Sequence, residues 1–332
     1  MSRIPLKFSA RRLATRFASL LAATSVFVGC HAKNGDGSTG TSGSDLDVPK
    51  MLKLPQKSDL IHVWGLNSKD VWGVGNKGRI VHFDGTEWKN TPSGTAAAVQ
   101  SIYGIAPNDV WAVGEDTTTL HWDGKVWTQG EPKKGETLLG IWASGPKDVW
   151  VAGVIVDDGS GVLRHFDGKT WEDDPITAAS SLWRAWGSSP SDIWMVGSTP
   201  DARGFILHGN GKHFDRFDYP GGPLRGVWGT SPDDVWVAEY EGVIQHWDGK
   251  KWTPTPGAKQ GRLLNLWGTG PTDVWACGLA GLVMHFDGSK WTRQVVNSKE
   301  VLWSVWTDAP NDAWVVGNMP FALHFDGSSW AP

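Results

Sequence analysis

The stretch from Asp70 to Trp88, DVWGVGNKGRIVHFDGTEW, decides the fold because its pattern recurs along the whole chain. Each copy has Asp, a hydrophobic residue and Trp, and then a run that ends in His. An Asp-Gly pair and a further Trp follow in every copy except the fourth. The Trp of the first element recurs at intervals of 39 to 44 residues, at Trp72, Trp111, Trp150, Trp194, Trp236, Trp275 and Trp314. Seven similar units of this length predict a closed ring of β-blades and argue against two ordinary domains.

The first unit has the features of four short strands. A β-branched and aromatic run at 60–64 predicts the first strand, and three further runs, up to residue 90, predict the others. Asp84-Gly85 is a hairpin signal, because both residues tolerate the positive φ of a tight turn. Four short strands joined by tight turns predict one antiparallel blade. By the same pattern the blades begin near residues 60, 99, 138, 182, 224, 263 and 302.

Both faces of the predicted blade are largely apolar. In the third strand Val81 and Phe83 alternate with Ile80 and His82, so apolar side chains point to both faces. Such a sheet needs neighbours on both faces, which radially packed blades supply and a two-layer sandwich does not. The expected fold is therefore all-β, a seven-bladed β-propeller with four antiparallel strands per blade over residues 49–332. Most of the 23 Trp side chains are expected to be core.

The ring is expected to close through the segment that precedes the first blade. The sequence stops at Pro332, where the fourth strand of the last blade has just begun. Residues 50–55 resemble the end of a fourth strand. We expect this segment to pair with the last blade.

Residues 1–29 have the features of a secretory signal peptide. They hold five basic and no acidic residues, and their apolar stretch at 17–29 is too short to span a bilayer comfortably. The stretch ends in Phe27-Val28-Gly29-Cys30, which resembles the lipobox of bacterial lipoproteins. The resemblance implies that Cys30 is lipidated and that a membrane is one partner. Because the next residue is not Asp, the lipoprotein sorting rule implies the outer membrane of a bacterial cell envelope.

The composition after residue 29 excludes some partners. Residues 30–48 are polar and rich in Gly, Ser and Thr, which predicts a flexible tether that holds the propeller off the membrane. Without residues 1–29 the chain has 26 basic and 35 acidic residues, a net charge of −9. No basic block remains, so nucleic acid is not an expected partner. Cys277 stands where sister repeats have Val and is expected to be a small buried hydrophobe.

Seven of the ten His residues occupy one repeat position: His82, His121, His165, His208, His246, His285 and His324. One Asp precedes the Trp of each unit: Asp70, Asp109, Asp148, Asp192, Asp234, Asp273 and Asp312. A metal centre needs ligands that converge on one point, whereas equivalent positions of seven blades are spread around a ring. We therefore expect a structural hydrogen bond between His and Asp in each blade, with no metal and no cofactor.

The departures from the repeat identify a candidate binding face. The connections between the second and third strands of the third and fourth units are longer than in the other units, and the fifth unit has an unusual sequence there. These connections emerge on one face of the ring, where repeat proteins often bind. Neutral variation of exposed loops is the alternative. The candidate binding residues are Asp157, Asp158, Arg203, Glu239, Tyr240 and Glu241.

The alternation of V-W-G, D-V-W-x-V-G and H-x-D-G-x-x-W over residues 56–332 resembles tectonin-type propellers, and more loosely Asp-box and WD-repeat propellers. Several tectonin-like proteins are lectins, which implies a possible glycan ligand, but none of their ligand residues can be transferred. An Asp-box has a residue between Asp and Gly, and here the two are adjacent. We expect a non-catalytic, envelope-displayed lipoprotein that binds a protein. A tectonin-like lectin is the alternative, and an Asp-box glycoside hydrolase is favoured less.

Overall fold

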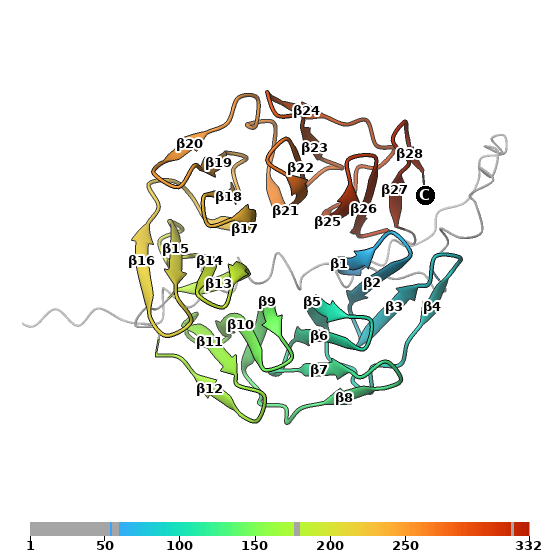
Figure 1. Ribbon diagram of the computed structural model, residues 1–332, viewed down its shortest axis with the longest axis vertical. Helices are drawn as coiled ribbons and strands as arrows, with labels where there is room; N and C mark the ends of the chain where they lie inside the picture. Colours follow the sequence, from blue (N-terminus) through green and yellow to red (C-terminus); the bar gives the residue numbers. More distant parts are fainter. Residues whose placement is uncertain (1–53, 55–59, 176–179, 320–321, 332) are drawn as a thin grey trace, which may run out of the picture.

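The computed structural model describes residue 54 and residues 60–175, 180–319 and 322–331. In this part of the chain the secondary structure consists of strands that form seven four-stranded antiparallel sheets. The sheets are arranged as blades around a central axis, in sequence order (Figure 1). The predicted all-β, seven-bladed propeller is therefore confirmed.

Each blade takes four consecutive strands, counted outward from the axis, and blades one to seven follow the chain (Figure 1). The innermost strands are β1 (Leu60–Asn67), β5 (Val99–Ala106), β9 (Glu136–Gly145), β13 (Ser181–Ser189), β17 (Leu224–Ser231), β21 (Leu263–Gly270) and β25 (Leu302–Ala309). The second strands are β2 (Asp70–Gly75), β6 (Asp109–Gly114), β10 (Asp148–Ile155), β14 (Asp192–Ser198), β18 (Asp234–Glu239), β22 (Asp273–Gly278) and β26 (Asp312–Gly317).

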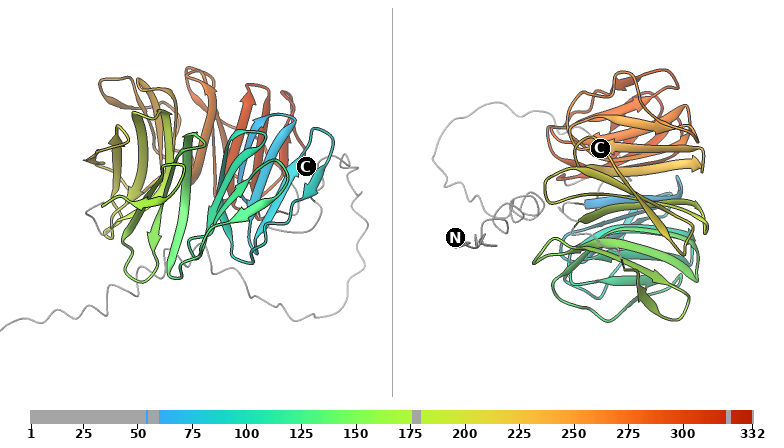
Figure 2. Two further views of the ribbon diagram at one scale, coloured as in Figure 1. Left: turned by 60° about the horizontal axis from the view of Figure 1, so that its bottom comes forward. Right: turned by 90° about the vertical axis from the view of Figure 1, so that its left-hand side faces the viewer.

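The third strands are β3 (Arg79–Phe83), β7 (Thr119–Trp122), β11 (Gly161–Phe166), β15 (Gly204–Gly209), β19 (Ile244–Trp247), β23 (Val283–Phe286) and β27 (Leu323–Phe325). The outermost strands are β4 (Trp88–Asn90), β8 (Trp127–Gln129), β12 (Trp171–Asp173), β16 (Phe214–Asp218), β20 (Trp252–Pro254), β24 (Trp291–Arg293) and β28 (Trp330–Ala331). Seen from the side, the strands run between the two faces of the ring (Figure 2).

The first strand is longer than the run of hydrophobic residues that predicts it. Strand β1 continues past residue 64 to Asn67, which pairs with Asp70, so only two residues form the turn. Register shifts near Leu60 and after Gly65 let the strand bend while it remains paired with β2. Strand length was underestimated because a polar end of a strand carries no hydrophobic signal.

Aromatic side chains join each blade to the next. The second-strand Trp72 of blade one packs on Trp122 and Trp127, the two aromatic residues that flank the hairpin turn of blade two, with ring centroids 5.5 and 5.6 Å apart. Equivalent pairs of contacts link the other neighbours around the ring, except that Trp150 of blade three packs on one aromatic ring of blade four, Phe214. The repeated H-[FW]-D-G-x-x-W therefore builds a two-sided aromatic clamp that holds the Trp of the preceding blade.

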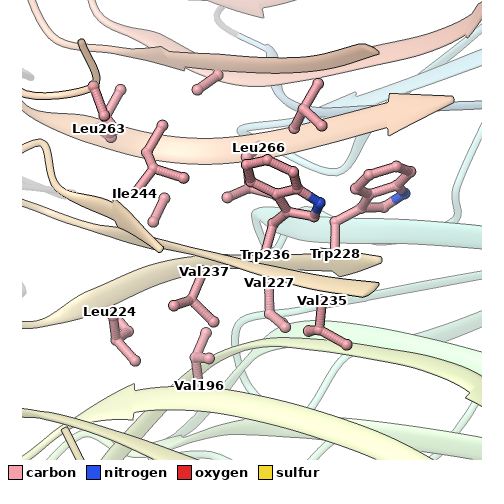
Figure 3. Close-up of a cluster of buried hydrophobic side chains, with 14 of the residues drawn as sticks. Val196, Leu224, Val227, Trp228, Val235, Trp236, Val237, Ile244, Leu263 and Leu266 are labelled. Carbon is pink, nitrogen blue, oxygen red and sulfur yellow. The ribbon is translucent and has the colours of Figure 1, made fainter. Parts of the chain in front are cut away.

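Blade five shows why both sheet faces are apolar. Trp236 and Ile244 point toward Leu263 and Leu266 of blade six, while Val237 points the opposite way, toward blade four (Figure 3). The side chains in this cluster are almost fully buried. Burial of a Trp removes roughly 200 Å² from water, so these contacts contribute a large share of the hydrophobic stabilisation.

Close packing between inner strands explains the Gly that follows the first-strand aromatic residue, as in Trp64-Gly65 and Tyr103-Gly104. A Cβ atom on Gly104 of blade two would lie 2.6 Å from the ring of Trp64 in blade one, and one on Gly65 would lie 2.7 Å from the ring of Trp306 in blade seven. The absence of a side chain at these positions admits the Trp of the preceding blade. The dipeptide Trp-Gly is thus a packing signal between inner strands.

Side chains also join the seam between blade seven and blade one. Trp314 packs on Phe83 and Trp88, at 5.3 and 5.5 Å between ring centroids. The backbone N–H of Ser68 donates to Asp308 Oδ2 at 2.6 Å. Within the described residues, the sheet of blade seven consists of β25–β28 alone.

The closing strand expected at 50–55 falls mostly outside the described residues. Leu54 is the exception: it is buried among residues of the first and last blades and belongs to no strand. The signal peptide, Cys30 and the tether also lie outside the described residues. No helix in the described part of the chain is long and apolar enough to cross a membrane.

Candidate functional site

The repeated His and Asp residues form one unit in each blade. Every repeat His lies with Nε2 at 2.5 to 2.9 Å from Oδ1 of the Asp that begins the second strand of its own blade. Because a carboxylate only accepts, the imidazole N–H is the donor. In six blades the second-strand Trp Nε1 donates to the same oxygen, at 2.9 to 3.1 Å. The His ring lies against that Trp, with centroids 3.7 to 4.3 Å apart.

Each of these units ties the second strand to the third strand within one blade, and the seven units do not form a common centre. Each stays inside its own blade, and the described residues contain no group of three or more His, Cys, Asp or Glu side chains that could hold a metal ion. Burial raises the pKa of Asp234, but hydrogen bonds from His246, Thr230 and Trp236 outweigh it and lower the pKa overall. Asp192 behaves in the same way. The buried carboxylates therefore stay ionised.

Cys277 is fully buried and is not part of any such unit. Burial raises the pKa of its thiol, so the thiolate that nucleophilic chemistry requires is disfavoured. The side chain fills space in the core between blades six and seven.

The candidate binding residues all lie at the face where inner strands begin and second strands end, which we call the loop face. The structure brings only some of them together. Tyr240 lies beside Arg225 and Arg262, whose guanidinium carbons are 5.4 and 5.2 Å from its ring centroid. Glu241 lies 3.6 Å from Arg262. Glu239 is buried and accepts from the hydroxyl of Tyr219 at 3.2 Å, so it supports the loop from within.

The other three candidates make local contacts. Asp157 and Asp158 are exposed in the turn after β10, and Asp158 accepts from the N–H of Ser160 at 2.8 Å. Arg203 is exposed and pairs with Asp201 of its own loop at 3.1 Å. No hydrogen bond or ion pair in the described part of the chain links these loops to Tyr240 or Glu241. They form separate patches of one face.

A set of residues that sequence analysis missed lies deeper, at the axial end of the loop face. We call it the axial cluster, and its members are His62, Trp183, Arg184 and Arg225. The guanidinium of Arg225 in blade five stacks over the ring of Trp183 in blade four at 3.6 Å. Arg184 Nη1 donates to the carbonyl oxygens of Leu139 and Trp183, both at 2.9 Å. The adjacent inner strands β13 and β17 thus each carry one of these cations, with Arg184 held against blade three and Arg225 against blade four.

The axial cluster has unpaired polar atoms. Nε of Arg184, Nε of Arg225 and Nδ1 of His62 are buried and have no hydrogen-bond partner. Burial lowers the pKa of each arginine to about 10, and the positive charge of Arg184 further lowers that of Arg225. Burial, with a contribution from Arg184, lowers the pKa of His62 well below 6.5. This is the behaviour of buried cationic groups without a counter-charge.

One sequence signal could have found the axial cluster. The two residues that follow the first buried aliphatic residue of each inner strand differ in every blade, although their neighbours repeat: Ile61-His62, Gln100-Ser101, Leu139-Gly140, Trp183-Arg184, Arg225-Gly226, Leu264-Asn265 and Trp303-Ser304. Arginine is rare at such inner positions unless it is paired. Loop length does not mark these positions, because they lie inside strands and not in connections.

Comparison with known proteins gives the fold alone. No protein-family model matches the chain, and no curated protein sequence matches it. Among solved structures, YCF48 bound to D1 peptide is 19% identical with a TM-score of 0.65, covering 86% of this chain and 99% of that one. YCF48 from Cyanidioschyzon merolae is 16% identical with a TM-score of 0.65, covering 84% and 99%.

Two neighbours of other function are equally similar in shape. Virginiamycin B lyase from Staphylococcus aureus is 12% identical with a TM-score of 0.69, covering 82% of this chain and 96% of that one. The WD40 propeller domain of Doa1 is 14% identical with a TM-score of 0.66, covering 84% and 96%. Propellers with such different activities share the scaffold, so function must be argued from the site. The comparisons place this chain among β-propeller repeat proteins.

Proposed function

We propose that this protein is a non-catalytic binding scaffold whose loop face holds a segment of another protein. The observation that carries the proposal is the concentration of departures from the repeat on one face, in the connections of blades three to five. A solved propeller of similar shape is described as bound to a peptide. The same scaffold can therefore present a peptide-binding surface.

The chemistry of the loop face suits a polar peptide with apolar anchors. Asp157 and Asp158 supply exposed carboxylates, and the neighbouring Val156 is 44% exposed. Tyr240 is an amphipathic side chain between two arginines, a residue type that often anchors protein interfaces. Charged and aromatic groups around small apolar contacts are typical of transient interfaces.

The glycan alternative, implied by the resemblance to tectonin-type propellers, has less support. A lectin of this kind would stack a sugar on an exposed aromatic ring that recurs between blades. All 23 Trp residues lie in the described part of the chain, and none is exposed. A hydrolase would need a pair of carboxylates across a bond, and the axial cluster contains cations instead.

We also propose that the scaffold is anchored by lipid on Cys30 at the bacterial cell envelope, in the outer membrane. The lipobox-like Phe27-Val28-Gly29-Cys30 and the polar segment after it support this. Mass spectrometry of the mature N-terminal peptide tests the anchor. A lipid-modified Cys30 is the expected result, and an unmodified chain that begins elsewhere would contradict it.

Peptide-display selection against the immobilised protein, run in parallel with a glycan array, tests the binding function. We expect enriched peptides whose affinity falls about tenfold or more with Tyr240→Ala or Asp158→Ala, a loss of roughly 1.4 kcal/mol or more. Lys125→Ala, in the hairpin turn at the opposite face, is the matched control and should leave affinity unchanged. Glycan binding without peptide enrichment would overturn the proposal in favour of a lectin.

A further inference from the structure

We propose that the axial cluster is a carboxylate-binding site that takes an acidic side chain or the C-terminus of a peptide at the axial end of the loop face. This inference deepens the proposed function, but it depends on different residues from those of the loops. Arg184 and Arg225 are its ligand-binding groups, and Trp183 is the surface that orients Arg225.

The first argument is the missing counter-charge. Neither Arg184 nor Arg225 forms an ion pair with any described carboxylate, and both have a buried Nε without a partner. Arg184 is a neighbour whose charge acts on Arg225 and on His62. Proteins rarely bury like charges together without an anion, because desolvation and repulsion both oppose it. Both arginines still retain part of their surface, so a ligand can reach them.

The second argument is that nearby acids are already engaged. Glu136 of blade three is bound by Lys133 and by Arg164, the latter at 2.6 Å. Glu241 faces Arg262, and Glu239 accepts from Tyr219. These three carboxylates are therefore bound by other groups, and none of them forms an ion pair with Arg184 or Arg225.

The third argument is that the arginines are held in place. Stacking on Trp183 covers one face of the Arg225 guanidinium and leaves the N–H groups free in its plane. Trp183 is itself fixed, because its Nε1 donates to Ser198 Oγ at 3.0 Å. Guanidinium groups held in this way present planar sets of N–H donors, the kind of group that binds carboxylate oxygens.

A glycine in blade three supports this arrangement. A Cβ on Gly140 would lie 2.9 Å from Cα of Arg184, so only glycine lets β9 come this close to β13. The close approach brings the carbonyl of Leu139 to Arg184 Nη1. The carbonyl fixes one end of the guanidinium and contributes no neutralising charge.

The test uses a fluorescein-labelled hexaglutamate peptide and fluorescence anisotropy at low ionic strength, with hexaglutamine as the uncharged comparison. We expect hexaglutamate to bind, hexaglutamine not to bind, and added salt to weaken binding. Arg184→Gln and Arg225→Gln should each weaken it about tenfold or more. Arg225→Lys keeps the positive charge but loses the planar guanidinium. Its affinity for hexaglutamate should therefore lie between those of the parent and of Arg225→Gln. Arg293→Gln, at the exposed end of β24, removes the same charge and should bind like the parent.

Two outcomes would overturn the inference: hexaglutamate that does not bind the parent protein, or binding that both axial glutamine variants retain. An oligoglucuronate that binds tenfold more tightly than the peptide would overturn the assignment of a peptide ligand. Thermal unfolding of each variant confirms that it is folded. If display selection yields no peptide but hexaglutamate binding still depends on Arg184 and Arg225, the carboxylate site stands and only the loop-face proposal fails.

Discussion

Buried charged groups have side-chain partners within the blades but lack a counter-charge in the axial cluster. In blade five, Asp234 is almost fully buried and receives hydrogen bonds from three side chains of its own blade. In the axial cluster, Arg184 and Arg225 lie on adjacent inner strands, each has a buried Nε without a partner, and neither forms an ion pair with a described carboxylate. The first arrangement recurs around the ring and the second occurs where the repeat is broken. The difference indicates that repeated residues maintain the ring, while the unrepeated cations are available for a ligand.

Disrupting the aromatic clamp between two blades is the strongest test of the claim that repeated residues maintain the ring. Trp236→Ala empties a site between Phe286 and Trp291 of the next blade, with ring centroids at 5.0 and 6.2 Å. We expect a loss of about 3–5 kcal/mol in the free energy of unfolding, measured with a chemical denaturant. Phe217→Ala, at a position 52% exposed, should cost less than about 0.5 kcal/mol. Similar losses at both positions would refute the clamp as a main source of stability.

Blade seven provides an internal comparison for the His-Asp unit. Asp234→Ala would leave three donors without an acceptor: His246, Trp236 and Thr230. Asp312→Ala would leave only His324, because Trp314 Nε1 has no partner and Thr307 donates to backbone carbonyls instead. We expect losses of about 3 and about 1 kcal/mol in denaturant unfolding. Equal losses would mean that hydrogen bonding does not set the contribution of this unit.

The fold was predictable because the same four-strand pattern occurs seven times in the sequence. The spacing of Trp72 and its equivalents gives the number of blades, and the Asp-Gly turns give the strands. The partners of individual side chains were harder to predict, since the clamp joins Trp72 to residues about fifty positions later in the next blade. Nothing in a single unit shows which neighbour a Trp meets.

The candidate site was predicted only in part, for a physical reason. Loop insertions are visible in a sequence, so the loop face and Tyr240 could be selected from it. Arg184 and Arg225 belong to different blades, 41 positions apart, and only the ring places them together. Their lack of a counter-charge is a property of the folded state, so it cannot be read from the sequence.

Paired and unpaired buried arginines should respond differently to the same substitution. Arg164→Met removes a cation held by Glu136 and Asp173 and leaves the buried Glu136 with Lys133 as its one cationic partner among the described residues. We expect a loss of about 2 kcal/mol. Arg184→Met removes a buried cation that has no counter-charge, and should leave the free energy of unfolding unchanged or raise it. A loss at Arg184 as large as at Arg164 would mean that Arg184 supports the fold, which would weaken its assignment to a ligand.

The axial cluster also predicts how stability depends on pH. His62 is buried beside the charge of Arg184, and its pKa in the folded protein is well below the ordinary 6.5. As pH falls below about 6.5, the imidazole of His62 becomes protonated in the unfolded chain but stays neutral in the folded protein. The free energy of unfolding therefore declines. The slope from this group cannot exceed about 1.4 kcal/mol per pH unit. This pH dependence ends at the lower pH where His62 becomes protonated in the folded protein as well.

His62→Gln isolates this contribution, because the seven repeat histidines are the same in both proteins. We expect the unfolding free energies of the parent and the variant, measured from pH 7.5 to 5, to diverge below about pH 6.5, with the parent falling more steeply. Parallel curves would show that His62 is protonated equally in both states. Equal protonation would mean that neither burial nor the charge of Arg184 acts on His62 in the folded protein, which would remove His62 from the axial cluster.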